Sequence, residues 1–253
     1  MKISAVILTK NEEKNIERCL KSLEFVDEII IVDDYSADRT VEIVHKVLNV
    51  HKVYKVFQRK LKKDFASQRN FGLEKASNDW VLFLDADETI TSELKQEIMS
   101  LVTLRVTNAF YLKRRDYFWG KELKHGEVKK VRDNGIVRLV KKDSGKWMGT
   151  VHEIFYTANK IGTLENYLNH YPHQILKEFI NDINYYSSIR AEELFNQEVK
   201  SNVVQIIFYP LVKFIYNYFI LLGFLDGAAG FAYSFMMSFH SFLVRAKLYQ
   251  LWQ

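Results

Sequence analysis

The feature that most constrains this fold is the alternation of short apolar runs with amphipathic helical segments over residues 1–104. The apolar runs are rich in β-branched and aromatic residues, and they occupy residues 2–8, 28–34, 53–57 and 80–84. Helices are predicted at residues 12–24, 40–48, 64–76 and 92–104, with Asn11 and Asp64 as N-caps of the first and third. Apolar strands that alternate with helices are typical of a parallel sheet covered on both faces. We therefore expect a doubly wound α/β half-domain.

Glycine and cysteine exclude several protein classes. The first glycine of the chain is Gly72, so the first strand and its turn contain neither GxGxxG nor a Walker loop. A Rossmann dehydrogenase or P-loop NTPase built on this N-terminus is therefore excluded. A disordered chain is excluded because 48% of the residues are apolar and 14% are aromatic. The single cysteine, Cys19, cannot form an internal disulfide, so the fold needs no oxidising compartment.

The pattern changes after residue 104. Strands are predicted at residues 108–120, 135–140 and 146–156, and their alternation suits antiparallel strands added to the sheet edge. From about Leu176 the chain is helical, first polar and then strongly apolar in two stretches. These stretches are residues 203–225, with Lys213 as their only charge, and 227–244, with no charge. The expected organisation is an α/β domain, 1–175, with a mostly parallel sheet, and a C-terminal helical extension, 176–253.

Polar clusters follow three of the predicted strands. They are Thr9–Asn11, Asp33–Asp34 and the Asp85-Ala86-Asp87-Glu88 segment. In an open parallel sheet, ligands bind beyond the carboxyl ends of the strands. One such Asp is by itself a turn or capping residue, but several unpaired carboxylates on one rim repel each other and call for a cation or a ligand. Asp85 and Asp87 would offer Mg²⁺ or Mn²⁺ two oxygen ligands.

Four segments resemble the inverting family 2 glycosyltransferases of GT-A fold: AVILTKNE, IIIVDDYSADRT, ASQRNFGLEKASNDWVLFLDADE and WMGTVHE. They follow the family's order and spacing from residue 1 to about 155, and look most like its lipopolysaccharide core β-1,4-glucosyltransferase-like branch. The resemblance implies a GT-A catalytic domain at 1–175, with a nucleotide-binding half at 1–104 and an acceptor half at 105–175. It implies a nucleotide-sugar donor, a UDP-sugar first of all, a lipid-linked or oligosaccharide acceptor, and Mg²⁺ or Mn²⁺ as cofactor.

The resemblance also assigns the nucleoside part of the donor to the first two strand ends. Thr9, Asp33 and Asp34 would hold the nucleotide base and the ribose. Many members carry an aromatic residue directly after the strand-one Thr, and its ring stacks on the base. Here Lys10 follows Thr9, so this chain departs from the family at that position.

The remaining implied roles concern the reaction itself. Arg69 would approach the diphosphate, while Asp85 and Asp87 would bind ribose and metal. Glu153 would be the general base that deprotonates the acceptor hydroxyl, as inversion without a protein nucleophile requires. Alternation along a strand at the sheet edge would place His152 and Glu153 on opposite faces, so only one of them can face the crevice.

The apolar C-terminal stretches suggest contact with a membrane. Residues 203–225 are long enough to span one, but Lys213 would then lie mid-span, so helices lying in an anionic membrane surface are the preferred interpretation. The segment FLDGAAGF (224–231) also resembles the tail of lipid-acceptor members of the family. Core helices or a homo-oligomer interface are the alternatives. The N-terminal apolar run is too short for a signal peptide, so we expect a location at the cytoplasmic face of the inner membrane.

The basic clusters and the absence of certain motifs bear on other partners and activities. The basic clusters near residues 59–63, 113–115, 129–130 and 141–142 suit anionic lipid or a phosphorylated acceptor. No nucleic acid partner is expected, because no helix-turn-helix, RNP motif or zinc spacing accompanies them. A sugar-nucleotide nucleotidyltransferase would carry a glycine-rich loop after strand one, which is absent here. A polyprenyl-phosphate glycosyltransferase remains an alternative, and a non-catalytic membrane module would not need Asp85, Asp87 and Glu153 together.

Overall fold

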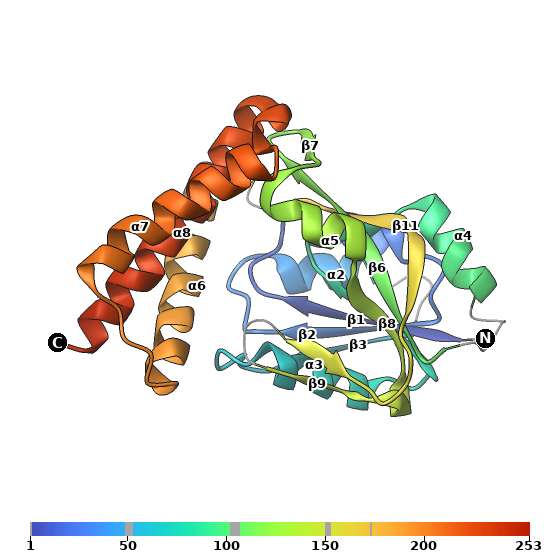
Figure 1. Cartoon of the computed structure of the whole chain (residues 1–253). Coiled ribbons are helices and arrows are strands. Elements are labelled where there is room, and N and C mark those ends of the chain that lie inside the picture. Colours follow the sequence, from blue (N-terminus) through green and yellow to red (C-terminus); the bar gives the residue numbers. More distant parts are fainter. Residues whose placement is uncertain (1, 49–52, 102–106, 150–152, 173) are drawn as a thin grey trace. The chain divides into compact units, whose positions relative to one another are not determined.

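The computed structural model describes residues 2–48, 53–101, 107–149, 153–172 and 174–253 (Figure 1). The chain divides into two compact units. The first unit comprises Met1–Arg114 and Asp133–His170, and the second comprises Arg115–Arg132 and Tyr171–Gln253. Residues 115–132 thus belong with the C-terminal helices, whereas the sequence boundary at residue 175 separates the two.

The first unit carries the alternating elements expected from the sequence. Its strands are β1 (Ile3–Thr9), β2 (Glu28–Asp33), β3 (Val53–Gln58), β4 (Trp80–Asp85), β5 (Glu88–Ile90), β8 (Ile136–Lys141), β9 (Lys146–Met148), β10 (Ile154–Tyr156), β11 (Gly162–His170) and most of β6 (Ala109–Phe118). Its helices are α1 (Ile16–Ser22), α2 (Thr40–Leu48), α3 (Phe65–Lys75), α4 (Ser92–Leu101), the end of α5 (Lys129–Asn134) and the 3₁₀ turn η2 (Lys142–Ser144).

The strands form a mixed sheet in the order β3-β2-β1-β4-β8-β6-β11-β5. Strands β1 to β4 are parallel, with Thr9 opposite Asp33 and Leu8 opposite Asp85 in the register. Strand β8 joins β4 antiparallel, so the parallel half is extended by antiparallel strands. The predicted doubly wound α/β fold is confirmed. Its register places the ends of β1, β2 and β4 at one rim.

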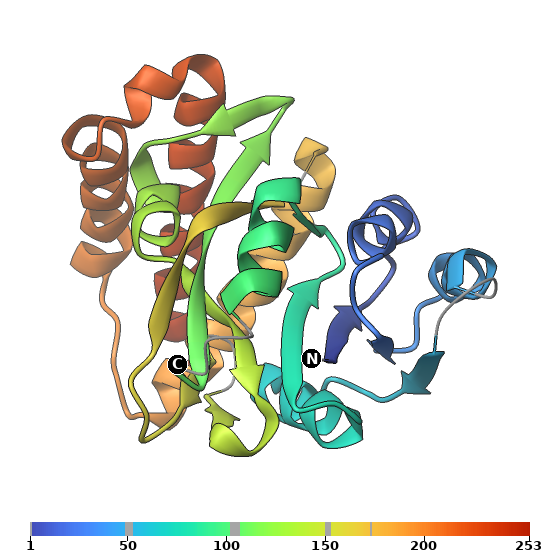
Figure 2. The ribbon, with the colours of Figure 1, turned by 90° about the vertical axis from the view of Figure 1, so that its right-hand side faces the viewer.

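Strands β1, β2 and β4 are buried along nearly their whole length, whereas the edge strand β3 is not. Figures 1 and 2 show helices on both sides of the sheet. Alternate side chains such as Ile7 and Ile31 pack under α1, α2 and α4, and the others, such as Val6 and Phe83, pack under α3 and the β9–β10 hairpin. Helix α3 lies so close to β1 that a Cβ on Gly72 would come within 2.3 Å of Val6 Cγ1. This tight packing holds α3 against the rim of the sheet.

One predicted helix cap is wrong and another is confirmed. Asp64 caps α3, because its side chain accepts a hydrogen bond from the backbone N–H of Ser67. Asn11 does not cap α1, which begins at Ile16 with Asn15 in the N-cap position. The backbone of Asn11 instead has a φ of 55°, and its Oδ1 accepts from the N–H of Ala37. A contact between two loops therefore decides this position, which helix propensity cannot predict.

The expected edge strand at residues 146–156 is also wrong. Strands β9 and β10 pair with each other, Trp147 opposite Phe155, in a separate two-stranded sheet. This hairpin is fastened to α3, because the Asn70 side chain donates to the Trp147 carbonyl at 2.8 Å and accepts from its N–H at 2.9 Å. Glu153 thus lies just before β10 rather than on an edge strand of the main sheet. His152 lies outside the described residues.

The second unit is mostly helical. Its elements are the end of β6, β7 (Lys121–Leu123), the 3₁₀ turn η1 (Gly126–Val128), most of α5, α6 (Leu176–Asn196), α7 (Val203–Ile215), the π-helical turn η3 (Tyr216–Ile220), the 3₁₀ turn η4 (Gly223–Asp226) and α8 (Gly227–Leu251). Helix α8 packs against both α6 and α7. Phe118, Phe179 and Met236 belong to its main apolar cluster.

Candidate active site

The rim of the sheet begins with a hydroxyl and a carboxylate at neighbouring strand ends. Thr9 Oγ1 donates to Asp33 Oδ1 at 2.9 Å, and both side chains are buried. Asp33 also accepts from the backbone N–H of Ser36 at 2.9 Å and from the Ser36 hydroxyl. The structure brings the predicted residues Thr9 and Asp33 together, but the Asp33 carboxylate already accepts hydrogen bonds from Thr9 and Ser36. Its expected contact with the nucleoside stays a prediction.

The next residue, Asp34, is more accessible. Its carboxylate pairs with Lys10 Nζ at 2.6 Å and accepts from the N–H of Leu61 at 3.0 Å. Lys10 is exposed, so this pair is open to water. Tyr35 follows with a φ of 53° and is 52% exposed. A positive φ is unusual for an aromatic residue, and such backbone strain clusters at functional sites.

Two buried arginines converge on Asp85 at the end of β4. Arg69, from α3, donates through Nη2 to Asp85 Oδ1 at 2.9 Å, and Arg138, from β8, donates through Nη2 to Asp85 Oδ2. Burial raises the pKa of Asp85, but the charges of Arg138 and Arg69 more than offset this. The pKa of Asp85 therefore lies well below its usual range. The carboxylate is ionised and both of its oxygens face guanidinium groups.

The same arginines connect Asp85 to two further carboxylates. Arg69 Nε donates to Glu153 Oε1 at 2.6 Å, and its guanidinium carbon lies 5.2 Å from the centroid of the Trp147 ring. Arg138 Nη2 donates to Glu88 Oε1 at 2.9 Å. The Nη1 atom of Arg69 is buried and has no acceptor among the described residues. Arg69 therefore links Glu153, the candidate base, to Asp85 at the end of β4, and its Nη1 is still available to donate a hydrogen bond.

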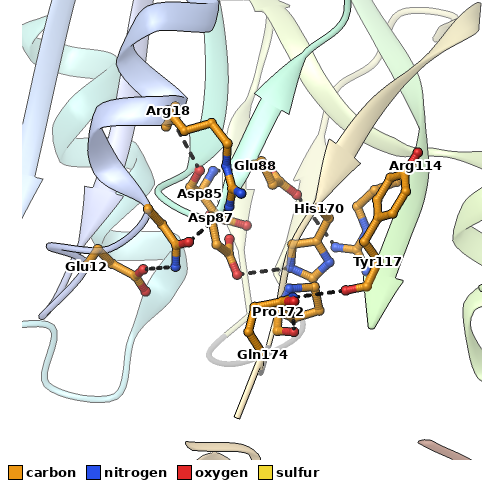
Figure 3. Close-up of polar contacts among 12 residues, drawn as sticks. Glu12, Arg18, Asp85, Asp87, Glu88, Arg114, Tyr117, His170, Pro172 and Gln174 are labelled. Atoms are coloured by element: carbon orange, nitrogen blue, oxygen red, sulfur yellow. Dashed lines mark hydrogen bonds and ion pairs between the residues drawn. The ribbon is translucent and has the colours of Figure 1, made fainter. Parts of the chain in front are cut away.

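Asp87 faces His170, as Figure 3 shows. Its Oδ2 is 3.2 Å from Nε2 of His170, which ends β11. Burial raises the pKa of Asp87, but the interaction with His170 outweighs it and the net pKa is lowered. On the far side, Arg114 of β6 lies 3.6 Å from Glu88. The carboxylates of this segment were expected to be unpaired, and this expectation is wrong, because basic side chains from α3, β6, β8 and β11 compensate them.

The expected divalent cation can be tested against this arrangement. Among the described residues, no three His, Cys, Asp or Glu side chains gather in a metal-binding group. Both oxygens of Asp85 are directed to arginines, so this residue does not present a free ligand. Asp87 and His170 together offer an oxygen and a nitrogen to a cation whose remaining ligands would come from phosphate. Of the predicted pair, Asp87 fits a metal and Asp85 fits a counter-ion of the arginines.

Sequence reasoning missed two members of the site. Arg138 lies within the run GIVRLV, where a lone charge in an apolar strand was the available signal. It is only 4% exposed, and a buried arginine needs carboxylate partners. His170 gave no signal, since β11 itself was not predicted. Only the pairing of β11 with β5, with His170 opposite Glu88, brings it to the rim.

Comparisons with known proteins show which family this chain resembles. Residues 4–156 match the family described as Glycosyl transferase family 2. An uncharacterised glycosyltransferase of Rickettsia bellii is 30% identical over 269 residues, covering 99% of this chain and 87% of the relative. The lipopolysaccharide core biosynthesis glycosyltransferase LpsC of Rhizobium meliloti is 28% identical, with 98% and 92% covered.

A solved structure supports the fold. S. aureus TarS 1–349, in complex with UDP-GlcNAc, superposes with a TM-score of 0.53 at 17% identity, covering 94% of this chain and 79% of that one. At this identity the likeness concerns the fold, and it confirms the predicted GT-A-like sheet with C-terminal helices. The family match spans every site residue described above from Thr9 to Glu153. The chain belongs to glycosyl transferase family 2 and is a glycosyltransferase.

Proposed function

We propose that this enzyme transfers a sugar, with inversion, from a nucleotide-sugar donor to a lipid-linked saccharide at the cytoplasmic face of the inner membrane. The observation that carries the proposal is the buried Arg69, which pairs with both Asp85 and Glu153. These ion pairs support the proposal, because a carboxylate that can act as the base and a cation that can bind diphosphate are then neighbours. A lipopolysaccharide core acceptor is favoured by the similarity to LpsC, and a UDP-sugar donor by the fold of TarS.

The reaction needs a base and a group that stabilises the leaving diphosphate. Glu153 removes the proton of the acceptor hydroxyl as the hydroxyl oxygen attacks the anomeric carbon. The bond from that carbon to the diphosphate breaks, and its electron pair leaves with the diphosphate. Arg69 stabilises this developing charge, and its free Nη1 is the donor available for a phosphate oxygen. Asp85 holds Arg69 and Arg138 in place.

A Mg²⁺ or Mn²⁺ ion held by Asp87, with His170 beside it, would neutralise part of the diphosphate charge. The nucleoside would lie over the ends of β1 and β2, against Thr9 and Asp34. Tyr35 is the exposed aromatic side chain at this rim. We assign it the stacking on the base that the residue after Thr9 performs in other family members.

The decisive variant is Glu153→Gln, which removes the base and keeps the size of the side chain. The first measurement is calorimetric titration of UDP-glucose, UDP-galactose and UDP-N-acetylglucosamine in the presence of Mn²⁺. The second is release of nucleoside diphosphate with lipopolysaccharide core acceptors. We expect donor affinity to persist and the rate to fall by roughly 10² or more, the usual scale of a general base.

Glu165→Gln is the matched control, because Glu165 is an exposed carboxylate of the same unit that pairs with Lys113. It should leave both measurements unchanged. If Glu153→Gln abolishes donor binding and spares the rate at saturating donor, Glu153 belongs to the donor site and the proposal for its role is wrong. If the enzyme transfers sugar only to polyprenyl phosphate, the proposed saccharide acceptor is wrong and polyprenyl phosphate is the acceptor.

A further inference from the structure

Helix α7 reverses the usual distribution of polar and apolar side chains. Its exposed side carries Ile207, Phe208, Leu211, Val212 and Ile215, each between 51% and 62% exposed. The helix is fully described, and none of its residues is buried. A surface helix of a water-soluble protein turns its apolar stripe to the core and its charges outward. We call these five side chains the α7 outer face. Exposure of such an apolar patch to water is unfavourable.

The polar groups of the same helix point inward. Lys213, the single charge of residues 203–225, pairs with Glu127 Oε2 of η1 at 2.6 Å. Asn217, in the following turn, donates to the same oxygen at 2.7 Å. The Ser238 hydroxyl of α8 donates to the Pro210 carbonyl at 2.6 Å. These bonds fix the rotation of α7, so its outer face does not turn into the protein.

The charges of this region favour an anionic partner. From residue 199 to 253, the only acidic residue is Asp226, which is 3% exposed, against four basic residues. Two of these lie over aromatic rings. The Arg245 guanidinium carbon is 4.2 Å from the ring centroid of Tyr209, and Lys200 Nζ is 5.1 Å from that of Trp252. Aromatic rings paired with cations are typical of the headgroup level of a bilayer.

We propose that the α7 outer face inserts into the surface of an anionic lipid bilayer, with the helix lying in the membrane plane. Leu222, Phe224 and Leu225, in and beside η4, are exposed apolar side chains as well. Neither these side chains nor the outer face include a carboxylate that would repel acidic headgroups. The proposal rests on the second unit alone, so it does not depend on the proposed reaction.

A membrane-spanning arrangement fits less well. The segment Val203–Ile220 is long and apolar enough to cross a bilayer by length and composition, and 6% of it is buried. Its inner side, however, is bonded to Glu127, which would then have to enter the hydrocarbon. Its neighbour α8 also packs on α6, which carries several charged residues such as Asp182 and Glu192. An in-plane helix keeps these groups in water.

The test is co-sedimentation of the full-length protein with phosphatidylcholine vesicles, with and without phosphatidylglycerol. The test variant is Phe208→Gln/Leu211→Gln/Ile215→Gln, which removes apolar surface and adds no charge. Val53→Gln/Met99→Gln is the matched control, since both side chains are exposed in the first unit. We expect the wild type and the control to bind, more tightly with phosphatidylglycerol, and the triple variant to bind roughly tenfold or more weakly.

Circular dichroism and sedimentation velocity without lipid complete the test. A folded triple variant that sediments with vesicles like the wild type would overturn the proposal. If the wild type does not bind vesicles but forms a dimer, and the triple variant is monomeric, the α7 outer face is a dimer interface and the proposal is wrong. Resistance of the membrane-bound protein to alkaline carbonate would favour a spanning helix and overturn the in-plane arrangement.

Discussion

The ion pairs of Asp85 with Arg69 and Arg138 predict how much this carboxylate contributes to the stability of the fold. Asp85→Asn keeps the shape of the side chain but removes the charge that faces Arg69 and Arg138. Removal of one partner from a buried ion pair costs about 3–5 kcal/mol. The cost here is smaller, because Arg69 keeps Glu153, Arg138 keeps Glu88, and the Asp85 side chain is 34% exposed. We expect a loss of about 2 kcal/mol in the free energy of unfolding.

The assay is urea unfolding at neutral pH without donor or metal. Asp87→Asn is the comparison. Asp87 is ion-paired with the imidazole of His170 rather than with two guanidinium groups, so this variant should lose less than about 1 kcal/mol. A double-mutant cycle of Asp85→Asn with Arg138→Met measures the coupling of the pair directly. If Asp85→Asn is as stable as the wild type, or the coupling energy is zero, the arginines do not hold Asp85 in solution. The counter-ion role given to Asp85 would then be refuted.

Three further predictions concern Asp87, Tyr35 and Glu28. Asp87→Ala should abolish transfer and leave the fold intact, and turnover near the wild-type value at saturating donor and Mn²⁺ would contradict its assignment. Tyr35→Ala should raise the donor KM and leave kcat nearly unchanged, whereas Tyr35→Phe should behave like the wild type, because stacking needs only the ring. The pKa of Glu28 is lowered to about 2. Burial raises this pKa, but hydrogen bonds from Ser4, Ser77 and Lys55 lower it by more. The ionised Glu28 side chain stabilises the fold above its pKa in the unfolded chain, and this stabilisation is lost as the pH falls through its pKa in the folded protein. Glu28→Gln should therefore lower the free energy of unfolding by on the order of 3 kcal/mol at pH 7 and by progressively less toward pH 2. Urea unfolding at each pH measures this loss.

Local sequence was enough to predict the parallel half of the sheet. Strands such as β1 and β4 carry apolar side chains on both faces because both faces are covered, and this pattern can be read without knowing the partner strand. Asp64 was predicted as an N-cap for the same reason, since its bond reaches only three residues along the chain. The position of Asp85 at a strand end followed from the length of the run before it.

Contacts between distant segments were beyond such reasoning. Arg69 and Glu153 are 84 residues apart, and they meet because the β9–β10 hairpin is bound to α3 rather than to the main sheet. Asn11 was misread because its side chain bonds to a loop 26 residues away. In both cases several partners compete for one polar group, and the local sequence does not say which partner will be near.

For this protein, the sequence by itself determined the α/β alternation, the family and the strand ends where we propose the active site, because hydrophobic periodicity and short motifs are local properties. Only the tertiary structure decided that Asp85 faces two arginines, that His170 joins Asp87, and that Lys213 turns inward on α7. The physical reason is that a buried charge takes its stability from whichever opposite charge the fold brings within a few ångströms. That distance depends on strand order and helix rotation, which are properties of the whole chain.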